Sequence, residues 1–86
     1  MGIEPVPLSD LLPGMKAVMI SMEVNGCIRR RLLDLGFIPG AEVEAVLKSP
    51  SGDSAAYSIR GAVIALRKGD AARILVRALE SEGRVN

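Results

Sequence analysis

With 86 residues and a formal net charge of +1, the chain can form one small domain and has no charge excess that would attract nucleic acid. It contains no histidine, the usual general base and the commonest metal ligand, and its aromatic residues, Phe37 and Tyr57, are too few to stack on nucleic-acid bases. Hydrophobic residues make up 49% of the chain, and its mean hydropathy is +0.30. These values predict exposed apolar surface that a partner or a second copy covers. The alternative is a monomer whose surplus of apolar residues is mostly alanine scattered over the surface.

The compartment is predicted from the single cysteine and from the apolar pattern. Cys27 has no second cysteine with which to form an intramolecular disulfide, which fits a reducing compartment. No apolar run approaches the ~20 residues that span a bilayer, and residues 1–9 lack the basic and apolar regions of a signal peptide. We expect a cytoplasmic protein that does not insert into a membrane and that contacts one only through another protein.

Few side chains could take part in bond-making chemistry. We expect Cys27 to be a small buried apolar residue, because no imidazole is present to activate its thiol. Glu42 and Glu44 are the best pair of carboxylates on one face, and we interpret them as the solvated side of a strand. One thiol and scattered carboxylates do not make a ligand set, so we expect no metal site, no cofactor and no enzyme activity.

The first part of the chain predicts an arm, a helical turn, a strand and a helix. Residues 1–7 are expected to form a flexible arm, because two prolines discourage regular structure. A single turn capped by Ser9 precedes a strand over residues 16–22 that is fairly apolar on both faces. Asn25 is a plausible N-cap for a helix that ends at Leu35.

The rest of the chain has the period-two pattern of strands. Residues 42–48 are the clearest strand, with Leu47 among the side chains expected on its inner face. Residues 80–86 are expected to form a polar tail, so the domain is expected to span residues 8–79. About five short strands and one helix inserted after the first strand predict a mainly β, small barrel. The three further strands are expected over residues 55–60, 62–67 and 74–79.

The segment from Arg29 to Gly40 is the most informative in the chain. Its apolar residues repeat at the spacing of one helix face, and Gly36 can adopt the left-handed conformation that closes a helix. Phe37 comes next as the apolar residue that folds back onto the last turn, and Pro39 with Gly40 suits a type II turn. The segment predicts a helix end, an elbow and the start of a strand.

Three motifs in order carry a family resemblance: Leu8–Gly14, Arg30–Gly40 and Ile59–Arg67. Together they resemble the ferrous-iron-transport protein A (FeoA) family, from about Leu8 to Leu79. The same small domain is similar to the C-terminal module of some metal-dependent transcriptional repressors. The resemblance implies an SH3-like barrel with a helical insert after the first strand.

The resemblance also implies a function in iron handling and a partner. That partner would be the large ferrous iron membrane transporter that carries a G-protein-like domain. On this basis we predict a small cytosolic accessory or regulatory protein that binds the transporter's cytosolic domain. Two alternatives stay open, a stand-alone regulatory domain related to the repressor module and a self-associating structural barrel.

The helix and elbow carry the candidate partner-binding residues. Arg30 and Arg31 can reach Asp34, whereas Arg29 has no obvious local carboxylate, so Arg29 is the better candidate for an external contact. The helix dipole disfavours an anion such as Asp34 in the last turn by up to ~1 kcal/mol. The local arginines are the simplest compensation, and a bond to the backbone of the following turn or a basic group of a partner are the alternatives. The apolar residues at the elbow either form an exposed knob or pack as core. The full candidate set is Arg29, Leu32, Leu33, Asp34, Phe37 and Ile38.

Overall fold

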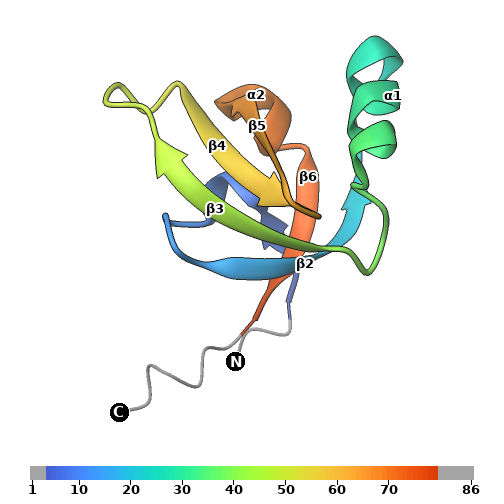
Figure 1. Ribbon diagram of the computed structural model, residues 1–86, viewed down its shortest axis with the longest axis horizontal. Coiled ribbons are helices and arrows are strands. Elements are labelled where there is room, and N and C mark those ends of the chain that lie inside the picture. The colour runs from blue at the N-terminus through green and yellow to red at the C-terminus, as the bar shows by residue number, and fades with distance from the viewer. Residues whose placement is uncertain (1–3, 80–86) are drawn as a thin grey trace.

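A computed structural model describes residues 4–79 as one antiparallel sheet of six strands, curled into a small barrel, with one projecting helix (Figure 1). The mainly β barrel is therefore confirmed, with six strands in place of about five. The strand order is β1-β6-β2-β3-β4-β5. The strands are β1 (Val6–Pro7), β2 (Lys16–Met22), β3 (Glu42–Lys48), β4 (Ser54–Ile59), β5 (Ala62–Arg67) and β6 (Ile74–Ala78), and the helical elements are η1 (Leu8–Asp10), α1 (Gly26–Leu35) and α2 (Lys68–Ala71).

The first strand corrects the predicted N-terminal arm. Val6 pairs with Val76 and Pro7 with Leu75, so the last two residues of the expected arm belong to the sheet. A proline is tolerated there because β1 is an edge strand, where a missing N–H breaks no ladder on the open side. The helix consequently comes after the second strand rather than the first. The start of the expected arm (1–3) and the polar tail (80–86) lie outside the described residues.

Two irregularities bend the long strands into a barrel. Register shifts occur between Met19 and Ser21 in β2 and between Ala45 and Leu47 in β3, so each strand carries one extra residue. Such bulges increase strand twist and curvature. In β3 the extra residue also reverses the faces of the side chains beyond it, because side chains alternate with a period of two. Leu47 is therefore 64% exposed, and its expected place on the inner face is wrong.

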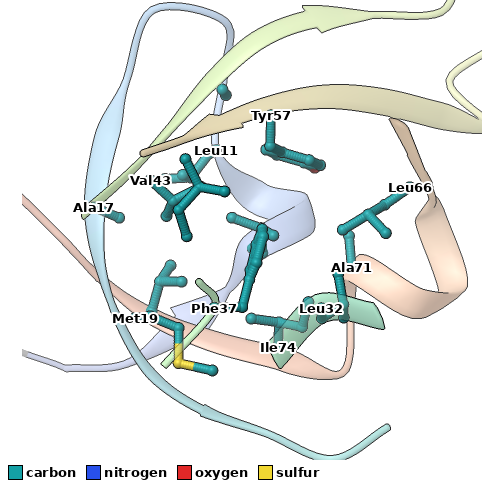
Figure 2. Packing of buried hydrophobic residues seen from close by; sticks show 14 of the residues in the cluster. Leu11, Ala17, Met19, Leu32, Phe37, Val43, Tyr57, Leu66, Ala71 and Ile74 are labelled. Carbon is teal, nitrogen blue, oxygen red and sulfur yellow. The ribbon is translucent and has the colours of Figure 1, made fainter. Parts of the chain in front are cut away.

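The core is centred on Phe37, which comes from the segment between α1 and β3. Figure 2 shows its ring among side chains from the strands, from the loop after η1 and from α1. Phe37 is 0% exposed, and residues as far apart in the chain as Leu11 and Ile74 are buried in the same cluster. The apolar residue after the helix therefore fixes the elbow to the barrel, as the helix-end motif predicts. The helix itself has ten residues, and no helix within residues 4–79 has the length and apolarity to cross a bilayer.

Candidate partner-binding surface

The end of α1 has the geometry that the sequence predicts. Gly36 adopts the left-handed conformation, with φ of 105°. The N–H of Phe37 donates to the carbonyl oxygen of Leu32 and the N–H of Gly36 to that of Leu33, both at 3.0 Å. These two bonds are the pair that defines the Schellman motif, and they satisfy carbonyl groups that the helix end would otherwise leave free.

A second turn lies between this helix end and β3, and backbone hydrogen bonds hold it against β2. The N–H of Ala41 donates to the carbonyl oxygen of Ile38 at 3.0 Å, and Gly40 has a φ of 92°, as a type II turn requires. The N–H of Gly40 donates to the carbonyl oxygen of Met19, and the N–H of Met19 donates to that of Ala41, both at 2.8 Å. The elbow is thus held on the barrel by backbone bonds as well as by Phe37.

The structure divides the six candidate residues into an inner and an outer group. Leu32 is 1% exposed and lies in the core with Phe37, so neither side chain is available to a partner, and these two candidates are corrected to core residues. Leu33 is 38% exposed and Ile38 is 43% exposed. Arg29 and Asp34 are also exposed. We call the outer group the helix–elbow surface: Arg29, Leu33, Asp34 and Ile38.

A shallow hollow lies on the outer side of α1. It has a volume of about 490 Å³ and is lined by Arg29, Arg30, Leu33, Asp34 and Gly26. An aliphatic side chain is therefore bordered by two cations and one anion on the same side of the helix. Such a site can hold an apolar anchor while the charged rim fixes its orientation, which is a common arrangement at protein interfaces.

Sequence reasoning missed Arg60, which contacts the elbow from the tip of the β4–β5 hairpin. A β-carbon added to Gly36 would collide with Cδ of Arg60, so the arginine stem lies directly over the helix end. A cation in this position is favourable to the helix C-terminus, where the dipole is negative. Arg60 has a positive φ of 52° and precedes Gly61 in the two-residue turn, and a turn was the only signal visible in the sequence.

The structure contradicts the expected burial of Cys27 and agrees with the expected solvated position of Glu42 and Glu44. Cys27 is exposed, which corrects its expected burial: it lies in the first turn of α1, away from the inner stripe of that helix. Glu42 and Glu44 lie on the outer face of β3 and line a hollow together with Lys16 and Arg60, so each carboxylate has cations nearby. Within residues 4–79 no group of three or more potential metal ligands occurs.

The family model for the FeoA domain matches residues 6–78, from β1 to the end of β6. The chain belongs to the FeoA family. A Porphyromonas gingivalis protein described as a fusion of Fe(2+) transport protein A with the Fe(2+) transporter FeoB is 36% identical to this FeoA domain over 74 residues. That match covers 86% of the chain but 9% of the relative, so the chain spans a small part of that protein's length.

Solved FeoA structures have the same fold. The FeoA protein from Chlorobium tepidum is 33% identical with a TM-score of 0.83, over 91% of this chain and 75% of that one. FeoA from Stenotrophomonas maltophilia, solved in complex with zinc and described as an SH3 domain protein, is 36% identical with a TM-score of 0.71, over 83% and 88% of the two chains.

The predicted likeness to repressor modules is confirmed at the level of the fold. A manganese-dependent transcriptional repressor aligns over 87% of this FeoA domain and 37% of the repressor, with a TM-score of 0.76 and 16% identity. Because the identity is so low, this likeness shows a shared SH3-like fold and carries no statement about regulation.

Proposed function

We propose that this FeoA domain is an accessory protein of a ferrous iron transport system and acts by binding the cytosolic, G-protein-like domain of the membrane transporter. The observation that carries the proposal is the fusion of a homologous domain to a FeoB transporter in one polypeptide. Fusion keeps two domains at high effective concentration, which is useful when they work in contact. A separate chain would have to achieve the same contact through a binding surface.

The helix–elbow surface is the best candidate for that contact. It presents two partly exposed aliphatic side chains, Leu33 and Ile38, on backbone that is fixed by the helix-end bonds and the turn onto β2. A rigid surface loses little conformational entropy on binding, so its apolar contacts contribute more fully to affinity. Arg29 and Asp34, of opposite charge, would orient the partner rather than supply most of the affinity.

The test is a calorimetric titration of this chain into the purified cytosolic domain of the ferrous iron transporter from the same organism. Leu33→Ala and Ile38→Ala should each weaken binding by about tenfold, since truncating an apolar side chain that contributes to an interface costs more than about 1 kcal/mol. Leu47→Ala is the matched control, because Leu47 is a more exposed aliphatic residue on β3, outside the helix–elbow surface. The Leu47→Ala variant should bind the transporter domain with the affinity of the wild type.

Two results would overturn the proposal. One is the absence of any binding at several hundred micromolar. The other is a Leu33→Ala, Ile38→Ala double variant that binds as tightly as the wild type. If sedimentation instead gives the mass of a dimer, the double variant is a monomer and no transporter binding is found, the surface serves self-association.

A further inference from the structure

A second, separate groove runs along the other side of α1, between this helix and strand β5. It has a volume of about 420 Å³, with Ile28, Arg31 and Leu32 on the helix side and residues 64–67 on the strand side. A neighbouring hollow of about 380 Å³ shares Ile28 and Asp70 with it and extends it toward the start of the helix. None of the four helix–elbow residues lines either hollow, so this groove is independent of the proposed transporter contact.

The wall formed by β5 is an open edge of the sheet. Among the strands of residues 4–79, β5 is last in the order and pairs on one side only, with β4. The N–H of Lys68 donates to the carbonyl oxygen of Asp53 at 2.8 Å, just beyond the pair of Arg67 with Ser54. In an antiparallel ladder the hydrogen-bonded positions alternate, so this bond fixes the phase of the hairpin. The even-numbered residues of β5 bond to β4.

The odd-numbered residues of β5 therefore direct their backbone groups toward the groove. Ala65, in the middle of the lining segment, points both its N–H and its carbonyl oxygen at the open edge. An exposed row of such groups is a ready template for one more strand. Ala65 also has the small side chain that lets another backbone approach closely.

The charges around the groove favour an acidic occupant. Arg31 and Arg67 line the main hollow, and Arg73 lines its extension. Asp70 is the one carboxylate among the residues that line the two hollows. Three arginines against one aspartate leave an excess of positive charge, and the half-buried Ile28 and the exposed Ala65 supply aliphatic surface beside it. An extended segment with alternating aliphatic and acidic side chains complements both properties.

We propose that the groove between α1 and β5 binds an extended acidic segment of a partner polypeptide, which adds to the sheet as a further strand beside β5. Backbone bonds to Ala65 supply register, the accessible surface of Ile28 and Ala65 contacts the aliphatic side chains, and the arginines select glutamate or aspartate between them. This goes beyond the proposed function, because it concerns a different surface and does not require the partner to be the transporter.

The test uses a panel of end-capped synthetic peptides of about nine residues, in which valine or isoleucine alternates with glutamate and threonine. NMR titration of the isotope-labelled full chain should show at least one peptide binding below millimolar concentration, with the largest shifts at the amides of residues 63–67. The Ala65 amide should also become protected from hydrogen exchange. The same peptide with N-methylated backbone positions should lose binding at least tenfold.

Two pairs of variants locate the site. Ala65→Pro removes the outward donor without touching the β4 ladder and should weaken binding at least tenfold, whereas Ala65→Val keeps the donor and should bind as the wild type does. Arg31→Glu should weaken binding similarly, whereas Arg30→Glu, on the outer side of α1, should not. Circular dichroism confirms that each variant is folded.

The proposal is wrong if no peptide of the panel binds at millimolar concentration. It is equally wrong if binding survives both Ala65→Pro and Arg31→Glu, or if Leu33→Ala and Ile38→Ala weaken it, because the peptide would then bind the helix–elbow surface. Failure of the transporter titration leaves this groove unaffected, so the two proposals fail separately.

Discussion

The barrel and the helix α1 differ sharply in how they are held. Of the sixteen buried hydrophobic residues within residues 4–79, Leu32 alone belongs to α1. The barrel strands are joined by continuous ladders, whereas the helix projects beyond them (Figure 1) and is attached chiefly at its C-terminal end. The difference suggests that the barrel supplies stability and that the helix is displayed, with one side toward a charged hollow and the other toward a strand edge.

Neighbouring residues at the elbow give the largest test of this division. Phe37→Ala should destabilise the protein by about 3–5 kcal/mol, because it opens a cavity at the centre of the core. Ile38→Ala should change stability by less than about 0.5 kcal/mol, because the side chain already meets water. Urea denaturation measures both, and equal losses would contradict the assignment of Phe37 to the core and Ile38 to the surface.

Gly36→Ala should have the next largest effect, about 1–2 kcal/mol, because Gly36 has a left-handed backbone that an alanine adopts with strain. Its new methyl group would also displace the Arg60 stem. Gly69→Ala is the matched control. Gly69 has space for a β-carbon and sits in α2, so this change should be neutral or stabilising by up to about 1 kcal/mol. Thermal unfolding compares the two.

Hydrogen exchange sharpens the comparison at residue level. The amides of residues 30–35 in α1 should open locally, with protection factors at least about tenfold lower than those of β3 and β4. The reason is that the helix buries one side chain, whereas those strands bury several. NMR-detected exchange measures both sets in one experiment. Equal protection would mean that helix and barrel unfold as a single unit.

The smallest effect is a loss of stability at alkaline pH. Burial raises the pKa of Tyr57 from its ordinary value of 10.0, because the phenolate loses hydration. The folded state therefore holds this proton more tightly than the unfolded state. Below pH 10.0 the contribution is fully present, and above it the free energy of unfolding falls as the pH rises through the folded-state pKa.

Tyrosinate absorbance measures this group alone, since Tyr57 is the single tyrosine and the chain has no tryptophan. The titration midpoint should lie higher in the native protein than in urea. Identical midpoints would contradict the burial of the phenol. Tyr57→Phe should make the alkaline fall in stability shallower.

Local signals in the sequence were sufficient for most of the fold. The bounds of β2, β3 and β5 agree with the predicted residues 16–22, 42–48 and 62–67 because their alternation is clear and turn formers flank them. The glycine and proline positions of the elbow were also predictable, since each has a conformation that few other residues adopt.

The features that could not be predicted depend on contacts between distant segments. Val6 and Pro7 form a strand because β6 offers an edge, which no local pattern reveals. The bulge in β3 that exposes Leu47 arises in the pairing of β3 with β4, which the alternation within β3 does not reveal. At the candidate site, the local pattern put Leu32 and Phe37 together with Ile38 among the partner-binding candidates, because it does not show which of these apolar side chains the barrel covers. The position of Arg60 over Gly36 results from the hairpin's placement against the elbow.

The pairing of β1 with β6 determines how the domain can be joined to other proteins. Val6 is opposite Val76, so the chain enters and leaves the barrel at neighbouring points, at the end of β2 remote from α1 (Figure 1). A tether attached before β1 or after β6 would emerge from the same pole. Either arrangement would leave the opposite pole, with its displayed helix, unobstructed, so the domain can be appended to a larger polypeptide without hiding that helix.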